Sequence, residues 1–428
     1  MTIQCSYEDR GFALVLTLSL LALLMLALVA LSTLVGVNGQ ISTVTAAQAR
    51  AQHNALLGLG LGRSDLQKHA GDDSQITGMA GITGIAAHAS NTTRNWCGVW
   101  RSDGSFVTWL TSGAQTTDSA SLKSGVSAVT LAGNGANGSA GSVGASTANS
   151  EHVIAGKLPI VVSEIAAAPG TESTIGSYAF LVLDEGVKIS AYSPSPQLII
   201  PGVVPLIMNS TTGSVQERLR SAVDSYSHNL PALISFEQLS LIPTPAVALT
   251  QSVLQDNFHH ATLTSLTLIG GDTRSGAINL NTTSPHVWGS ILETYNSVPG
   301  VTPFSTGDLS SLGASIADGF PSSFSGKAAG GPFTNIIAFA TSSLLADHLP
   351  PTITPEDFIA AMNGMLVVRS DTFRVRAYGE ALDPLDGITI QAVAYCEAIL
   401  QRTPDLAPNG MGRKFVVTYF RWLGPDDI

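Results

Sequence analysis

The chain has 428 residues, of which 44% are hydrophobic and only 12% are charged, and it contains 42 glycines. This composition is typical of an extracytoplasmic, strand-rich and loop-rich protein rather than of a charged cytosolic enzyme. The formal net charge is −11, and the lysines and arginines are scattered along the sequence. Both features argue against a nucleic-acid partner, because phosphate binding needs clustered basic side chains.

A long apolar stretch lies near the start of the chain. Residues 12–37 carry no formal charge, and the next charged side chain after Arg10 is Arg50. As a helix this stretch would be about 39 Å long, more than the roughly 30 Å hydrocarbon core of a bilayer. We therefore expect a transmembrane helix over residues 12–37, followed by a large soluble domain. The side chains expected to contact lipid and neighbouring helices are Phe12, Leu16, Leu20, Leu24, Leu28 and Leu31.

A cleaved secretory signal is the first alternative for this stretch, because Ala47 and Ala49 supply an A-x-A site. The hydrophobic region of such a signal is normally about 7–15 residues, and this one is far longer. Length therefore favours an uncleaved helix.

The residues that precede the apolar stretch resemble a type IV prepilin. The order is a short polar segment (1–11), Arg10, Gly11, Phe12 and then the apolar helix. The resemblance implies that residues 1–11 are a leader and that a membrane prepilin peptidase cuts between Gly11 and Phe12. Leu16 stands where most pilins have a glutamate, and this departure resembles the K-type minor pseudopilins and PilX-like proteins. A plain single-pass anchor explains the apolar stretch equally well.

We expect the helix to continue through residues 38–70 outside the membrane, because residues 41–68 are rich in Ala, Gln and Leu. Gly58, Gly60 and Gly62 should loosen or bend this part. Residues 49–56 and 66–72 resemble the Verru_Chthon cassette protein A family, which is pilin-like.

Residues 71–212 are predicted to be rich in β structure. Residues 96–112 should form a hairpin around Asp103 and Gly104, a strong turn signal. Its three tryptophans suit packing in a core better than stacking on sugars. Residues 113–156 should form a flexible loop, in which the GxGxxG pattern at 133–138 lacks the helix that a dinucleotide site needs.

A second hairpin is predicted over residues 178–191, with Asp184, Glu185 and Gly186 in its turn. Two adjacent carboxylates in a turn normally point to water, and they lack the facing geometry of paired catalytic acids. We therefore interpret them as a structural turn. The residues from Asp184 to Lys188 also resemble the cassette family.

Residues 213–366 are expected to be mainly helical. The predicted helices begin at a capping box at 214–217, at Ser284 with Pro285, at 331–334 and at 354–357, and they end near 226, 295, 346 and 362. Asn279 and Asn281 should bond local backbone. The Asn-x-Asn-Thr sequence before a capped helix resembles both the cassette family and the K-type pseudopilins.

Residues 367–428 show the clearest strand pattern, because apolar and polar residues alternate through 373–380. With strands at 388–400 and 414–422 this pattern predicts a three-stranded antiparallel meander with one covered face. Residues 369–373, 376–381 and 420–423 match the cassette family most specifically. The predicted fold class is therefore α+β: a long pilin-like helix, antiparallel hairpins, a helical middle section and a C-terminal meander.

No catalytic or metal-binding pattern is complete in the sequence, which lacks HExxH, CxxC and Walker A motifs. Asp383 and Asp386 are weak calcium candidates, since calcium wants several converging oxygens. Cys97 and Cys396 suit either one long-range disulfide or two buried thiols. We expect no enzyme activity, no cofactor and no small-molecule substrate.

Two functions remain at this stage. The resemblance implies a structural subunit of a type IV pilus or a type II secretion-like pseudopilus, anchored in the inner membrane with its soluble domain in the periplasm. Its partners would be other pilin-like subunits and a prepilin peptidase. The alternative is an anchored carbohydrate-binding protein or hydrolase that uses the Trp96–Trp109 region. Exposed rings around a cleft would favour this alternative, and rings buried against the stem helix would favour the pilin-like subunit.

Overall fold

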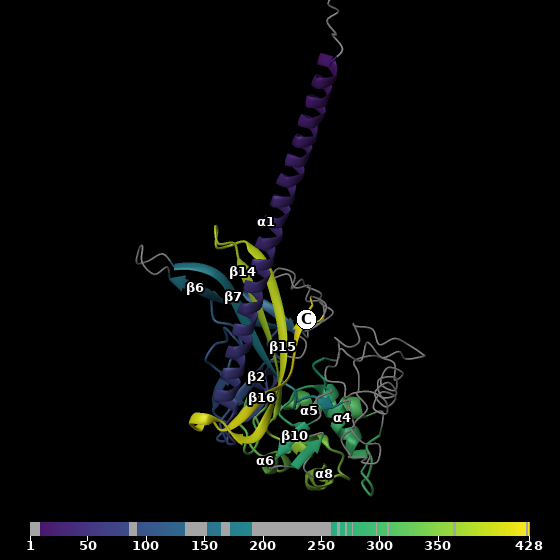
Figure 1. The fold of residues 1–428 in the computed structure, drawn as a ribbon. Helices are drawn as coiled ribbons and strands as arrows, with labels where there is room; N and C mark the ends of the chain where they lie inside the picture. The colour runs from purple at the N-terminus through teal and green to yellow at the C-terminus, as the bar shows by residue number, and fades with distance from the viewer. Residues whose placement is uncertain are drawn as a thin grey trace, which may run out of the picture.

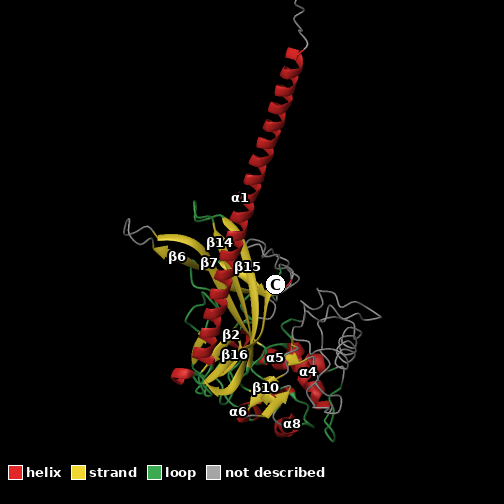
Figure 2. Cartoon of the chain, viewed as in Figure 1, coloured by secondary structure: helices red, strands yellow, loops and turns green. Residues whose placement is uncertain are grey.

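The structure is a computed structural model. It describes residues 9–84, 92–132, 152–163, 172–190, 258–262, 266–269, 272–275, 277–296, 298–305, 308–362, 365–424 and 427. Within these ranges, a long N-terminal helix is followed by a sheet-rich part with antiparallel strands and several helices (Figure 1, Figure 2). The fold is therefore α+β. The predicted leader up to residue 8, the GxGxxG pattern and the capping box at 214–217 lie outside the described residues.

Helix α1 (Asp9–Ala70) runs without interruption through both the apolar stretch and its predicted extension. Side chains from residue 14 to residue 46 are exposed, and burial begins at Ala47. Figure 1 shows the first half of α1 projecting beyond the rest of the molecule and the second half lying along the sheet.

The docked half of α1 contacts the sheet through a stripe of small residues at helical spacing. Its buried positions are Ala47, Ala51, Ala55, Gly58, Gly62, Leu66 and Ala70. A Cβ at Gly58 would lie 2.8 Å from the Ala179 carbonyl oxygen, and one at Gly62 would lie 2.9 Å from a Val375 methyl group. The predicted bend at Gly58, Gly60 and Gly62 is not seen, because α1 runs through these residues without a break (Figure 1). Gly58 and Gly62 instead allow the close approach of α1 to the strands.

The main sheet has five antiparallel strands in the order β16-β15-β14-β7-β6. They are β6 (Leu158–Ser163), β7 (Glu172–Asp184), β14 (Thr372–Leu382), β15 (Ile390–Leu406) and β16 (Arg413–Leu423). The predicted meander is confirmed as β14-β15-β16. It does not stand alone, because β7 pairs with the other edge of β14 over Phe373–Ala381.

The prediction that the meander has one covered face is wrong for β14, since every residue of this strand is buried. Phe373, Val375 and Ala377 belong to the core beneath α1, which we call the stem core. The alternate residues Arg374, Arg376 and Tyr378 point to the opposite face and are also buried. A second core covers that face, and we call it the far core.

Shorter ladders surround the main sheet. Strands β1 (Ile76–Met79), β2 (Cys97–Trp100) and β3 (Phe106–Trp109) form a three-stranded antiparallel sheet, and the short 3₁₀ helix η1 (Ala80–Thr83) directly follows β1. The pairs are β4 (Ala128–Ala132) with β5 (Val153–Gly156), β8 (Ile189–Ser190) with β9 (Ala261–Thr262), β10 (Leu266–Ile269) with β11 (Asp272–Ser275), and β12 (Ile278–Asn279) with β13 (Leu366–Val367).

These ladders test three local predictions. The hairpin at 96–112 is confirmed as β2 and β3, with Gly104 at a φ of +83° in the turn. The described ends of the predicted flexible loop form the β4–β5 ladder. The hairpin at 178–191 is wrong: β14 pairs with one edge of β7, and Leu110 and Ser112 bond the other edge at Phe180 and Val182. Strand β8 instead pairs in parallel with β9.

The described helices that follow are α4 (Pro285–Asn296), α5 (Leu309–Gly319), α6 (Ile336–Ala340), α7 (Ser343–His348) and α8 (Pro355–Met362). The caps predicted for α4 and α8 are confirmed: Ser284 Oγ accepts from the Val287 N–H at 3.2 Å, and Thr354 Oγ1 accepts from the Asp357 N–H at 3.1 Å. The helix predicted from 331 to 346 is instead divided into α6 and α7, and Asn335 caps α6. Helix α5 lies within the region predicted to be mainly helical but is not among the individual helices predicted there.

Candidate functional site

The first candidate site is the projecting half of α1. Among the described residues, α1 is the one helix that is long and apolar enough to cross a membrane. The six side chains predicted to contact lipid are between 55% and 73% exposed: Phe12, Leu16, Leu20, Leu24, Leu28 and Leu31. Their spacing of three or four residues places them on one side of the helix. A large apolar surface without a protein neighbour marks a site that contacts lipid or another chain.

The predicted processing residues lie at the very start of this helix. Arg10 and Gly11 are in the first turn of α1, and Phe12 follows with 73% of its surface exposed. Leu16 is 55% exposed and has no charged group to offer a neighbouring chain.

A second candidate site lies on the face of the main sheet opposite α1. We call it the charge cluster, and its residues are Glu185, Lys188, Arg374, Arg376 and Glu397. All five are at least 96% buried. Glu185 Oε1 lies 2.7 Å from Lys188 Nζ and 3.0 Å from Arg374 Nε. Glu397 lies 2.7 Å from both Arg374 Nη1 and Arg376 Nε.

The cluster is assembled from distant parts of the chain. The register that places Arg376 opposite Glu397 on β15 also places Arg374 beside the end of β7, where Glu185 follows. The Phe258 ring lies 4.3 Å from Lys188 Nζ and 4.4 Å from the Arg376 guanidinium carbon, so it contributes cation–π contacts. The chemistry of the cluster is that of a structural ion-pair network.

The surroundings of Asp184 and Glu185, which are adjacent in the chain, shift the pKa values of their carboxyl groups in opposite directions. Burial disfavours the charge of Glu185, but Arg374 and Lys188 outweigh this effect and hold its pKa at about 2. Burial raises the pKa of Asp184 to about 6, because its neighbours are hydroxyl and amide groups. The prediction that this pair points to water is wrong: Asp184 is 3% exposed and Glu185 is 2% exposed.

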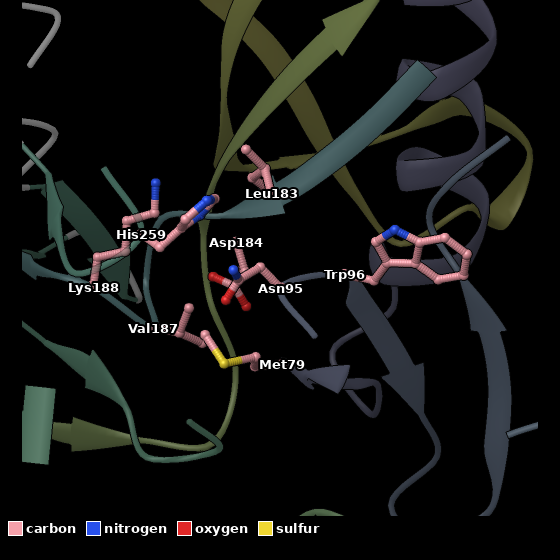
Figure 3. A pocket seen from close by; sticks show the side chains of 8 residues that line it. All are labelled: Met79, Asn95, Trp96, Leu183, Asp184, Val187, Lys188 and His259. Atoms are coloured by element: carbon pink, nitrogen blue, oxygen red, sulfur yellow. The ribbon is translucent and has the colours of Figure 1, made fainter. Parts of the chain in front are cut away.

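Asp184 also lines a small cavity of about 10 Å³, which has room for about one water molecule. The cavity is lined by Met79, Asn95, Trp96, Leu183, Asp184, Val187, Lys188 and His259 (Figure 3). The described residues contain no group of three or more His, Cys, Asp or Glu side chains that suits a metal ion. A cavity of this size holds no substrate or cofactor.

The two asparagines of the Asn-x-Asn-Thr sequence join the sheet to the helical part. Asn279 Nδ2 donates to the Thr77 carbonyl at 2.9 Å and to Ser370 Oγ at 3.1 Å. Asn281 Nδ2 donates to the Phe333 carbonyl at 3.2 Å, and Asn281 Oδ1 accepts from the Phe333 N–H at 2.9 Å. The prediction that these asparagines bond local backbone is confirmed for Asn279 Oδ1, which accepts from the Asn281 N–H at 3.1 Å. It misses the other bonds, whose partners are far away in the sequence.

The aromatic hairpin lies inside the molecule. Trp96, Trp100 and Trp109 are at most 2% exposed and belong to the far core rather than to the stem core. No sugar can stack on rings that are covered in this way. Cys97 and Cys396 are free and buried in the stem core, where burial raises the pKa of Cys396 to about 12.

The calcium candidates Asp383 and Asp386 lie in the exposed turn between β14 and β15. Asp383 Oδ1 accepts from the Leu385 N–H at 2.9 Å, and Asp386 Oδ1 accepts from the Ile388 N–H at 2.8 Å. The carboxylates therefore already stabilise their own turn.

Comparison with known proteins adds nothing to this geometry, because neither a family model nor a curated protein matches the chain.

Proposed function

We propose that the chain is a pilin-like, membrane-anchored structural subunit of a type IV pilus or type II secretion-like pseudopilus. The observation that carries this proposal is the division of α1 into a projecting apolar half and a half docked on an antiparallel sheet. This division gives one helix two tasks: the projecting half enters the lipid, and the docked half fixes the sheet to it.

The route into a filament begins in the inner membrane. Residues 12–37 hold the chain in the bilayer while the sheet-rich part lies on the periplasmic side. A prepilin peptidase cuts between Gly11 and Phe12, and the new N-terminus stays in the membrane. The apolar side chains of α1 then exchange lipid for the helices of other subunits, which is possible because packing rather than a hydrophobic gradient drives helix association in a bilayer.

The position of the subunit follows from Leu16. An aliphatic side chain cannot form an ion pair with the N-terminal amine of a neighbour, so the interaction that a glutamate provides at this position is missing. This absence favours a minor or tip subunit over a repeated shaft subunit.

Co-expression with a prepilin peptidase tests the proposal. The expected product has the intact mass and the N-terminal sequence of a chain that begins at Phe12. Gly11→Val should abolish this product, because a bulky residue blocks the cut. Gly39→Val is the matched control, since a side chain at Gly39 meets nothing within 4 Å. A chain that stays uncut, or one cut after Ala49, contradicts the proposal.

A further inference from the structure

The turn between β14 and β15 carries two highly exposed aliphatic side chains. Leu385 is 94% exposed and Ile388 is 79% exposed, so Leu385 exceeds even the projecting leucines of α1. Even an exposed Leu or Ile side chain in a folded domain normally has part of its surface buried by neighbouring residues. Leu385 and Ile388 have very little of theirs buried.

The turn that presents them is well formed. The Gly387 N–H donates to the Asp383 carbonyl at 2.8 Å, and Gly387 has a φ of +65°. The Asp383 and Asp386 carboxylates accept from backbone N–H groups of the turn. Because these polar groups already have partners, the turn can approach an apolar phase at a smaller desolvation cost than an open loop.

The turn lies at the end of the sheet from which the apolar half of α1 projects (Figure 1, Figure 2). Gln48 Nε2 donates to the Val393 carbonyl at 3.3 Å, so Val393 of β15 lies beside Gln48 of α1. Ile388 precedes Val393 by five residues, or up to about 16 Å of strand, and this length equals about 11 residues of helix. The turn therefore reaches at most the level of α1 near Val37, where the predicted membrane-spanning stretch (residues 12–37) ends.

We propose that Leu385 and Ile388 form a second membrane contact, which dips into the interfacial layer of a zwitterionic bilayer beside α1. This inference rests on the membrane anchoring in the proposed function. Residues 12–37 are about 9 Å longer than the hydrocarbon core, and a helix accommodates such an excess by tilting. A tilt toward β14 and β15 brings the turn onto the bilayer surface.

The charges of the turn select the kind of lipid. A hydrogen bond from Thr389 keeps the pKa of Asp386 below its usual value, so this carboxylate is ionised at neutral pH. At the membrane surface it faces choline groups favourably, whereas anionic headgroups repel it. The contact should therefore weaken as the anionic fraction of the bilayer rises.

Site-specific fluorescence on the full chain tests the contact. In a Cys5→Ser background, an environment-sensitive dye is attached to Leu385→Cys or Ile388→Cys, and the protein is reconstituted into phosphatidylcholine vesicles. Leu406→Cys is the matched control, because Leu406 is 75% exposed at the opposite end of β15. Leu24→Cys reports whether α1 is inserted.

On reconstitution, dye emission at positions 385 and 388 should rise several-fold, and spin-labelled lipid should quench it. Emission at position 406 should be quenched only by iodide, which is dissolved in the water. Added phosphatidylglycerol should reverse the change. If Leu24 is quenched by lipid but position 385 behaves like 406, the anchor holds and the second contact is refuted. If Leu24 also stays in water, both the anchor and this inference fail. Protection at 385 that depends on protein concentration and not on spin-labelled lipid would mean that a second copy covers the turn, which also overturns the inference.

Discussion

Asp184 and Glu185 are neighbours in the chain, yet their surroundings drive their titration in opposite directions. Glu185 contacts Lys188 and Arg374, whereas Asp184 Oδ1 accepts from the Gly186 N–H at 2.8 Å and Asn279 Nδ2 lies 3.5 Å from its other oxygen. Burial with neutral partners raises the pKa of a carboxyl group, and two neighbouring cations lower it. Each residue therefore has its own effect on stability.

The raised pKa of Asp184 makes stability depend on pH. The native pKa of about 6 lies above the unfolded value, so the native chain binds more protons between about pH 4 and pH 6, and stability falls as the pH rises through this interval. Asp184→Asn stays neutral, and we expect it to be more stable than the parent by up to about 3 kcal/mol near pH 7.5 and equally stable near pH 4. Urea unfolding of the full chain in detergent at several pH values measures this difference. A difference that is constant at all pH values would mean that the amide disturbs packing instead of removing a charge.

Glu397 is the acceptor for two buried guanidinium groups, and Arg421 Nε lies 3.2 Å away as a third partner. Removing its charge leaves Arg374 and Arg376 without this partner inside the protein. We expect Glu397→Gln to lower the free energy of unfolding by about 3–5 kcal/mol, as for other broken buried pairs. The exposed Glu356→Gln on α8 should change it by less than about 0.5 kcal/mol in the same assay. Similar small effects for both variants would show that the charge cluster adds little to stability.

At the scale of the elements, the contact between α1 and β14 depends on the absence of side chains. A Cβ at Gly379 would collide with the backbone of Ala51 and Ala55, and Gly58 and Gly62 of α1 contact the sheet from the helix side. The helix therefore lies much closer to the strands than leucines would allow.

Two glycines in the docked half of α1, Gly58 and Gly60, provide an internally controlled test of this contact. We expect Gly58→Ala to destabilise the docked half, because its methyl group meets the Ala179 carbonyl at 2.8 Å. Gly60→Ala should instead stabilise it by about 0.5–1 kcal/mol, since nothing lies within 4 Å of that position and alanine favours helix. Thermal unfolding of both variants in detergent is the measurement. Equal stabilisation by both substitutions would contradict the close approach at Gly58.

The elements that the sequence predicts well are those with local causes. The uncharged stretch predicts the first half of α1, and the Ala, Gln and Leu content of residues 41–68 predicts its continuation. Asp103 with Gly104 is sufficient to predict the β2–β3 turn. Ser284 and Thr354 predict the starts of α4 and α8 through their own cap bonds. Alternation predicts the three strands of the meander, because neighbours in the chain are neighbours in the sheet.

The parts that the sequence does not predict depend on long-range pairing. The bond between Arg374 and Glu185 joins residues 189 positions apart, and the bond from Asn279 to Thr77 spans 202 positions. Alternation identifies β7 as a strand but does not name β14 as its partner. One signal was available for the charge cluster: Arg374 and Arg376 alternate with apolar residues in a strand whose partner carries Glu397, which suits cross-strand ion pairs.

At the scale of the whole molecule, the projecting half of α1 can be altered with little effect on the folded part, because its described side chains from residue 14 to residue 46 are exposed. We expect Leu24→Arg to reduce the fraction of the chain that resists carbonate extraction from membranes, since an arginine at the centre of a spanning helix costs about 2.5–3.5 kcal/mol. Gln40→Arg, outside residues 12–37, should leave this fraction unchanged. Equal extraction of both variants would show that residues 12–37 do not lie in the bilayer.

The position of α1 at the start of the chain and of β14 near its end sets the order of events during synthesis. About 300 residues separate the two elements, so at roughly 5–20 residues per second the helix waits on the order of 15–60 s for that strand to leave the ribosome. During this interval the stripe that later docks on the sheet is open to water and to other chains. Because the stripe consists mostly of alanine and glycine, it exposes little apolar area. The small side chains that permit close packing in the finished protein thus also keep the nascent helix from adhering to other surfaces before its strands arrive.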